Sequence, residues 1–169
     1  MQPTKQQLEI IARQLGRNPR SIAAIAHATG EGVPVVLQMR SLVANKPFPT
    51  LYWLCSQDLD KAIARIESTG WIKDIETELL QNDMLRQEYH QQQADYVARR
   101  WQLMTDEDRQ ATDALGFTEL FNRLGIGGIA QWDKVRCLHM QYAHHLVAEN
   151  LIGKRLDEEF ELNKLKVEF

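Results

Sequence analysis

The sequence predicts an α+β fold, in which a small antiparallel sheet of about three strands is followed by, and packs against, five or six helices. Three observations predict this fold. Short segments rich in β-branched and aromatic residues occur before residue 56, amphipathic segments with helical spacing follow them, and glycine or proline residues separate the segments. A chain of 169 residues buries about two thirds of its unfolded surface, so it needs no metal or disulfide in order to fold.

The first predicted elements are a helix and a hairpin. Thr4 is suited to cap a helix whose apolar residues follow helical spacing, and Gly16 is suited to end it. Residues 21–28 and 33–39 then predict two antiparallel strands that are joined by a turn at residues 30–32.

A third strand is predicted over residues 50–55, because this segment is dense in aromatic and branched residues. Alternation places Tyr52 and Leu54 on one face of the strand, and Trp53 and Cys55 on the other. A central strand that is buried on both faces explains this composition without any function. The alternative is that Tyr52 lines a ligand cleft.

Helical spacing dominates after this strand. The predicted helices are one capped by Ser56 or Asp58 and closed by Gly70, one from Trp71, one over residues 83–103, one capped by Thr105, and one over about 133–151 with Gly153 as its stop. We expect residues 1–155 to form a single α+β domain. Residues 156–169 are expected to form a C-terminal tail, whose partly alternating apolar residues suit a strand, a helix or an arm that binds a protein partner.

Charge is unevenly distributed along the chain, although the net charge is only −3. Residues 1–56 hold six basic and two acidic residues, whereas residues 57–115 hold seven basic and thirteen acidic residues. The N-terminal third is therefore the part best suited to meet an anion, and the middle third is typical of solvated helix faces. The chain is mildly acidic and carries no nucleic-acid motif, so sequence-specific nucleic-acid binding is not expected.

The sequence also predicts a cytoplasmic protein. It contains no run of about 18 apolar residues that would span a membrane, and its N-terminus lacks the apolar core of a signal peptide. Two cysteines do not make a secreted disulfide scaffold. No particular cofactor is indicated.

Three arginines form the first candidate binding site. Arg17 and Arg20 flank an Asn-Pro pair, and Arg40 joins them at the open end of the predicted hairpin. Clustered guanidinium groups bind phosphate or carboxylate groups through paired hydrogen bonds. The alternative is that these side chains solvate the end of the sheet and pair with acidic residues of the helices.

The second candidate site combines a glycine-rich loop with the helix that follows it. Backbone N–H groups at Gly127 and Gly128 are suited to approach an anion beside Arg136. Cys137 lies early in the predicted helix and next to this arginine, which favours a reactive thiolate. The glycine spacing matches neither a Walker loop nor a dinucleotide-binding fingerprint, and a buried, unreactive cysteine is the commoner outcome.

No metal site is expected. In one continuous helix, Cys137 and His144 would lie about 10 Å apart along the axis, which is too far for both to bind one ion without strain. Cys137 and His139 could share a metal only if the helix began between them. Cys55 could join Cys137 and one histidine only if the third strand packed on this helix. The ligand spacings that are typical of structural zinc sites are missing.

Several of these segments together resemble a bacterial protein family, the domain of unknown function numbered 501. The segments are Leu15-Gly16-Arg17 with Pro19-Arg20, residues 47–55, Gly127-Gly128, Cys137-Leu138-His139 and Ala143-His144. The likeness covers roughly residues 10–150. Members of the family are uncharacterised, so the resemblance implies a shared fold and site but no reaction. In the family pattern a glycine commonly follows the Pro-Arg pair, where this chain has Ser21.

The candidate sites coincide with the segments that carry the resemblance, which favours one shared cleft for an anionic small molecule. The expected ligand-binding residues are Arg17, Arg20, Arg40, Tyr52, Gly127, Gly128 and Arg136, and the expected catalytic residues are Cys137, His139 and His144. Acid–base or thiol chemistry at this cleft would make the protein an enzyme. The alternative is a non-catalytic adaptor that binds another protein through the polar helix over residues 83–103 and the C-terminal tail.

Overall fold

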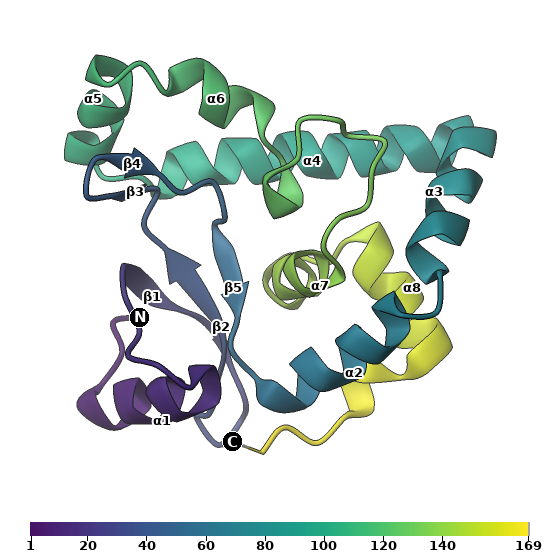
Figure 1. Ribbon diagram of the computed structural model, residues 1–169, viewed down its shortest axis with the longest axis horizontal. Coiled ribbons are helices and arrows are strands. Elements are labelled where there is room, and N and C mark those ends of the chain that lie inside the picture. The colour runs from purple at the N-terminus through teal and green to yellow at the C-terminus, as the bar shows by residue number, and fades with distance from the viewer. Residues whose placement is uncertain (169) are drawn as a thin grey trace.

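The computed structural model describes residues 1–168 and has the predicted α+β fold (Figure 1). Three antiparallel strands form the main sheet in the order β1-β2-β5, and a short hairpin forms a second sheet. The strands are β1 (Ile22–Ala28), β2 (Pro34–Met39), β3 (Leu42–Val43), β4 (Lys46–Pro47) and β5 (Tyr52–Leu54). All three predicted strands are present. However, β5 lies at an edge of the sheet rather than at its centre, because β2 pairs with a strand on each side.

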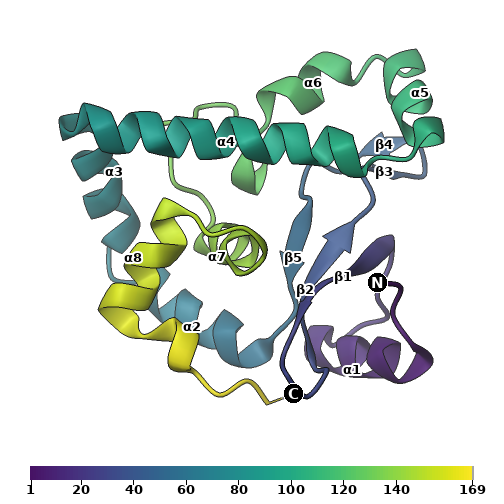
Figure 2. The same ribbon diagram turned by 180° about the vertical axis from the view of Figure 1, so that it is seen from behind.

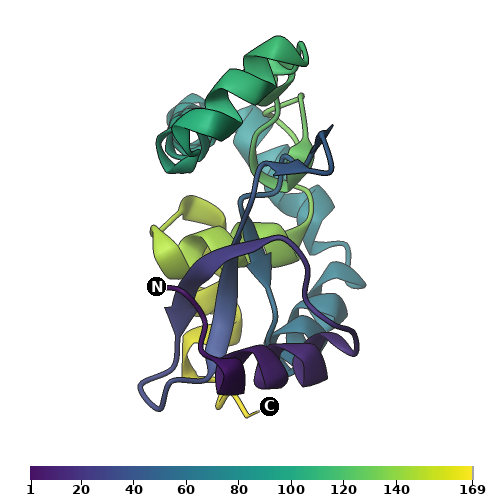
Figure 3. The same ribbon diagram turned by 90° about the vertical axis from the view of Figure 1, so that its left-hand side faces the viewer.

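Helix α1 (Lys5–Leu15) covers one face of the sheet. The Thr4 side chain caps its start, and Gly16 ends it at φ +67°, as predicted. Buried Ile11 packs against Leu37 of the central strand. The opposite face of the sheet packs on α7, so the sheet is enclosed between two helices (Figure 3).

The other helices follow the sheet in the sequence. They are α2 (Gln57–Glu67), α3 (Trp71–Gln81), α4 (Asp83–Leu103), α5 (Asp106–Ala114), α6 (Thr118–Arg123), α7 (Leu138–Val147) and α8 (Leu151–Phe160), with short 3₁₀ turns η1 (Ile126–Gly128) and η2 (Leu162–Lys164). The predicted helices that correspond to α2, α3, α4 and α5 are confirmed, and Ser56 and Thr105 cap two of them. The predicted end of α2 at Gly70 is wrong, because α2 ends at Glu67 and Gly70 directly precedes α3. None of the helices within residues 1–168 is long and apolar enough to cross a membrane.

The predicted start of the helix over about 133–151 is wrong. Helix α7 begins only at Leu138, because neighbouring elements hold the backbone before it in a non-helical conformation. The backbone N–H of Val135 donates to Oε1 of Glu76 at 3.0 Å, and Cys137 has φ −82° and ψ 150°. A helix end therefore falls between Cys137 and the histidines.

The predicted end of that helix is also wrong, since α7 ends at Val147 and Gly153 lies inside α8. A Cβ atom at Gly153 would lie 2.0 Å from Cγ of His145. Glycine at this position allows α8 to pack closely against α7.

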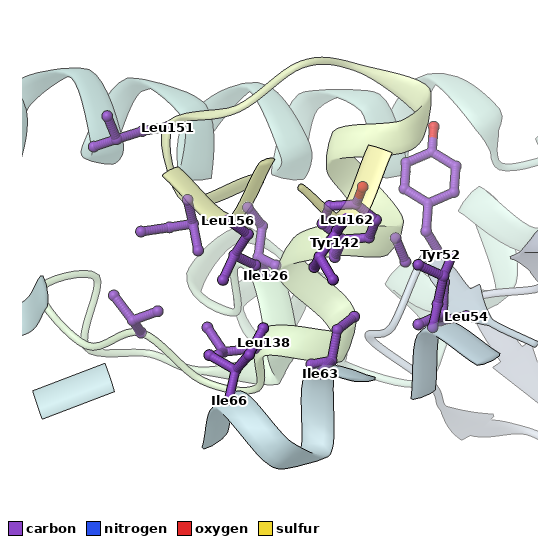
Figure 4. Packing of buried hydrophobic residues seen from close by; sticks show 14 of the residues in the cluster. Tyr52, Leu54, Ile63, Ile66, Ile126, Leu138, Tyr142, Leu151, Leu156 and Leu162 are labelled. Carbon is purple, nitrogen blue, oxygen red and sulfur yellow. The ribbon is translucent and has the colours of Figure 1, made fainter. Parts of the chain in front are cut away.

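Helix α7 is the centre of the molecule. In Figures 1 and 2 it lies between the sheet and α8, with α4 on one side and α2 on the other. Its buried residues Leu138 and Tyr142 join Ile63 and Ile66 of α2 and Leu156 of α8 in the main core (Figure 4). Groups at the start of α7 are thus held by several elements at once.

The C-terminal residues pack onto the rest of the domain. The predicted division after residue 155 falls inside α8, and both Leu156 and Leu162 belong to the main core. Val167 packs against the same core, and the backbone N–H of Glu168 donates to the Asp58 carboxylate at 2.7 Å. Residues 156–168 therefore contribute to the fold.

Candidate functional site

Three reactive side chains meet where α2 ends and α7 begins. His139 lies in the first turn of α7, and its Nδ1 is 3.3 Å from Sγ of Cys137. The same Nδ1 is 3.1 Å from Oε1 of Glu67, the last residue of α2. Because α7 begins at Leu138, the condition that would let Cys137 and His139 face one ligand is met. We refer to Glu67, Cys137 and His139 as the Cys–His–Glu centre.

Further contacts fix this centre in place. Nε2 of His139 lies 3.1 Å from both the carboxylate Oδ1 and the backbone oxygen of Asp60. Asp60 lies on the same face of α2 as Glu67, seven residues before it. The backbone N–H of Leu138 donates to Oε1 of Glu67 at 2.9 Å. All three residues of the centre are partly buried. The side chain of His139 keeps 16% exposure, so the centre is accessible but oriented by the fold.

The surroundings of His139 favour its charged form. The hydrogen bond with Cys137 is the largest effect, and together with Asp60 and Glu67 it raises the pKa of His139 to about 9 against the opposing effect of burial.

The glycine loop holds the backbone that leads into the centre. Gly127 has φ +75°, and a Cβ atom there would lie 2.2 Å from the carbonyl oxygen of Arg136. Two loop N–H groups are already used, since Ile126 donates to Oε1 of Gln93 and Gly128 donates to the oxygen of Gly125. These contacts position the Arg136–Cys137 backbone. That the loop cradles an anion stays a prediction.

Arg17 and Arg20 line a pocket between the end of α1 and the sheet. The rest of its lining is mostly apolar and comprises Leu15, Pro19, Ser21, Ile22, Leu37, Met39, Val43, Phe48 and Trp53. Neither guanidinium has a hydrogen-bond or ion-pair partner among residues 1–168. Both side chains are therefore available to a ligand.

A second pocket continues from the first toward α2. The two share Leu15, Arg17 and Trp53, and the second also reaches Ser56 and Asp60. Asp60, which lines the second pocket, also contacts His139, whereas no residue of the Cys–His–Glu centre lines either pocket. We call the two pockets together the arginine groove.

Arg40 does not belong to the groove. Its backbone N–H donates to the oxygen of Ser21 at 2.9 Å, so it does lie at the predicted open end of the hairpin beside Arg20. Its guanidinium, however, pairs with Asp108 at 2.9 Å and lines a different pocket. For Arg40 the alternative prediction is therefore correct, because its side chain pairs with an acidic residue of a helix.

Tyr52 and His144 lie together but apart from the Cys–His–Glu centre. Their rings stack with centroids 6.1 Å apart, and both line another pocket against α4. Burial is the main cause that lowers the pKa of His144 to about 4, and His145 adds to the effect. Of the two histidines considered as partners for Cys137, the structure brings only His139 beside it.

Cys55 is also separate from the centre. It is buried with Ile11 and Leu37 between α1 and the sheet. Burial raises the pKa of its thiol to about 12, which suits a packing role.

Sequence reasoning missed three functional or positioning residues: Asp60, Glu67 and Arg100. Asp60 and Glu67 are seven residues apart on α2, so the helical period places them on one stripe. Arg100 is fully buried and donates to the backbone oxygens of Pro49, Phe121 and Leu124. It thereby fixes the turn that leads into β5.

Comparison with protein families finds a match over most of the chain. The family described as "Protein of unknown function (DUF501)" matches residues 25–158. No curated protein and no solved structure was found to match the chain. The matched residues include the whole Cys–His–Glu centre, whereas Arg17 and Arg20 lie before them.

Proposed function

The chain belongs to the DUF501 family of proteins of unknown function, and from its geometry we propose that it binds an anionic small molecule with an apolar body in the arginine groove. The Cys–His–Glu centre would then act on the part of the ligand that extends toward Asp60. The observation that carries the proposal is the pair of unpartnered arginines on an apolar pocket.

The free guanidinium groups support an anionic ligand. Other arginines are already engaged: Arg40 pairs with Asp108, and Arg155 pairs with Glu78 at 2.6 Å. Arg17 and Arg20 have no such partner among the described residues and line the same pocket. Charge-assisted hydrogen bonds from such groups to phosphate or carboxylate are among the strongest polar contacts in proteins.

The apolar lining supports a ligand with a hydrophobic part. Phe48 and Trp53 stack with ring centroids 6.3 Å apart and form one wall of the pocket. Ile22 and Met39 add aliphatic surface. Small-molecule sites are commonly apolar with a few polar groups that fix orientation. A purely inorganic anion would leave this surface without a partner, so an aromatic or acyl body is favoured.

The lining that the two pockets share, and the contact of Asp60 with His139, support chemistry at the Asp60 end of the arginine groove. Trp53 and Arg17 line both pockets, and Asp60 lines the second pocket while its carboxylate contacts His139. A ligand anchored at the arginines would therefore extend toward the imidazole. A histidine beside a thiol is the arrangement used for nucleophilic and acid–base catalysis.

The test is direct titration of the purified protein, by calorimetry, with aromatic and acyl phosphates and carboxylates. Each is compared with its uncharged counterpart, for example 1-naphthyl phosphate with 1-naphthol. We expect the charged members to bind and the double variant Arg17→Gln/Arg20→Gln to bind at least about tenfold more weakly, since each lost charge-assisted contact contributes about 1.5–3 kcal/mol.

The matched control is Arg65→Gln/Arg123→Gln, which removes the same charge from two exposed arginines outside the groove. This control should bind like the wild type. The proposal is rejected if no member of the panel binds, or if both double variants lose affinity equally, because the effect would then reflect net charge alone.

A further inference from the structure

We propose that Glu67, Cys137 and His139 bind one divalent transition-metal ion, and that zinc fits the site best. The three ligand atoms lie within 4.8 Å of one another, and each residue offers one of them. Within residues 1–168 this is the one place where three such side chains converge in this way. The inference concerns the chemistry of the centre and does not require the arginine groove to bind a ligand.

The crowding at one ring nitrogen points to a cation. Nδ1 of His139 lies 3.3 Å from the sulfur of Cys137 and 3.1 Å from Oε1 of Glu67. A ring nitrogen carries at most one proton and can direct it at only one of these atoms. A metal ion accepts the nitrogen, the sulfur and the oxygen together, so it satisfies all three groups at once.

The distances suit tetrahedral coordination. With Zn–S near 2.3 Å and Zn–N and Zn–O near 2.0–2.1 Å, neighbouring ligand atoms of a tetrahedral site lie about 3.3–3.6 Å apart. The observed separations of 3.3 and 3.1 Å are within a few tenths of an ångström of this range. The third pair of atoms, the sulfur of Cys137 and a carboxylate oxygen of Glu67, lies within 4.8 Å, so shifts of about 1 Å or less bring all three atoms to tetrahedral separations.

The ligand types favour zinc over magnesium or calcium. The latter two prefer oxygen ligands throughout, whereas a thiolate and an imidazole select zinc and similar transition metals. Two of the three ligands, Cys137 and Glu67, also bring negative charge that would offset that of the ion.

The outer contacts match those of a ligating histidine and carboxylate. A metal-bound histidine usually donates its other ring N–H to a carboxylate or a backbone oxygen. Nε2 of His139 is 3.1 Å from both kinds of group on Asp60. Oε1 of Glu67 is held by the N–H of Leu138 at 2.9 Å. These contacts orient both ligands before any ion arrives.

Three protein ligands leave one tetrahedral position for water or substrate. This is the arrangement of catalytic zinc sites, whereas structural sites use four protein ligands. Asp60, on the far side of His139, lines the arginine groove. The inference therefore places the metal beside the end of the groove that we propose to be reactive.

The experiment uses the full-length, untagged protein after treatment with a chelator and removal of that chelator. Zinc binding is measured by competition with a chromophoric chelator, and cobalt(II) is added separately as a spectroscopic probe. We expect about one equivalent of zinc per chain and a cobalt–thiolate charge-transfer band in the near ultraviolet. Cys137→Ser should abolish the band and weaken zinc binding at least about 100-fold, since it removes a ligand.

The two cysteines provide a matched control. Cys55→Ala changes the only other cysteine, which is buried outside the centre, and it should retain both the band and the zinc affinity. Asp60→Asn tests the outer contact and should weaken zinc binding about 10–100-fold while the cobalt band persists. Glu67→Gln keeps an oxygen that can accept the hydrogen bond from the Leu138 N–H, so the fold should be retained. A loss of zinc affinity in this variant would therefore reflect the loss of the carboxylate ligand.

The proposal is overturned if the stripped wild-type protein takes up no stoichiometric zinc. It is also overturned if Cys137→Ser and Cys55→Ala bind zinc equally when circular dichroism shows both to be folded. Arg17→Gln/Arg20→Gln should leave zinc binding unchanged. Loss of anion binding and loss of metal binding are therefore separate results.

Discussion

Two of the three histidines of α7, His139 and His144, lie in opposite surroundings, although only five positions separate them. His139, at the start of the helix, faces a thiol, two carboxylates and a backbone oxygen. His144, farther along, is buried between aromatic rings, with Tyr96 meeting its edge at a centroid distance of 5.3 Å. The first histidine has neighbours that accept protons or share a metal, whereas the second has none of these.

The partner of His144 shows the difference most clearly. Nδ2 of Asn150 lies 2.9 Å from Nδ1 of His144, and an amide nitrogen can only donate. Oδ1 of Asn150 accepts from the N–H of Gly153 at 2.7 Å, which fixes the orientation of the amide. His144 is therefore held neutral, as an acceptor at Nδ1. The hydrogen-bonding character of its neighbours, more than the residue type, separates a histidine of the core from one of a site.

The largest expected effect is a loss of stability on replacing Arg100, and it tests whether the His144 side of α7 is structural. Arg100 lies over the ring of Tyr96, 5.3 Å from its centroid, and donates to three backbone oxygens from inside the core. Arg100→Met would leave these oxygens buried without donors, so we expect a loss of about 3–4 kcal/mol in the free energy of unfolding. Urea denaturation measures this loss.

The neighbouring residue provides the control. Arg99→Met removes the same group from an exposed position of the same helix and should change the stability by less than about 0.5 kcal/mol. If both variants were equally stable, the buried guanidinium would not be a structural element.

The next largest effect is a dependence of the free energy of unfolding on pH. An unfolded histidine has a pKa of about 6.5, whereas burial lowers that of folded His144 to about 4. Between these two pKa values the unfolded chain binds more protons than the folded chain. The contribution of neutral His144 to the free energy of unfolding is therefore fully present above pH 6.5 and is lost as the pH falls toward 4. The loss amounts to at most about 3 kcal/mol.

This dependence is measured by urea denaturation at several pH values with chelator present, so that the Cys–His–Glu centre holds no metal. His144→Gln removes the titrating group, and the difference between the two stability profiles isolates its contribution. The nearby His145 and Asp95 are retained in both proteins. Parallel profiles would contradict the assignment of His144 as a buried neutral group.

A smaller effect tests the packing that encloses this side of α7. Gly153→Ala would bring a Cβ atom within 2.0 Å of His145 and should cost about 2 kcal/mol through overpacking. Gly30→Ala meets no atom within 4 Å and has no left-handed backbone to strain, so it should be nearly neutral. Thermal denaturation of both variants makes the comparison, and equal midpoints would contradict it.

Local signals predicted the elements that depend on local contacts. Helix α1 follows from its Thr4 cap and its terminal Gly16, and Thr105 begins α5 as predicted. The start of α7 could not be predicted in this way, because Glu67 and Glu76 of distant helices bind the backbone just before and at its first turn. The error in one helix end therefore concealed the contact between Cys137 and His139.

Only part of the candidate site could be predicted, because the rest depends on contacts between residues that are distant in the sequence. Cys137 and His139 stood out by residue type, but Asp60 and Glu67 look like any acidic residues on a polar helix. In the sequence, Arg99 and Arg100 cannot be told apart as exposed and buried. Ser21 is a different case: the resemblance indicates glycine at this position, and the residue has φ +59°, a left-handed conformation that glycine adopts more easily.

Replacing His139 or His144 of α7 tests the proposed metal site most directly. The wild type, His139→Gln and His144→Gln are stripped with chelator, supplied with zinc, passed through a desalting column and assayed for zinc per chain. We expect about one zinc ion per chain for the wild type and for His144→Gln, and none for His139→Gln. Equal zinc content in the two variants would contradict the proposed metal site.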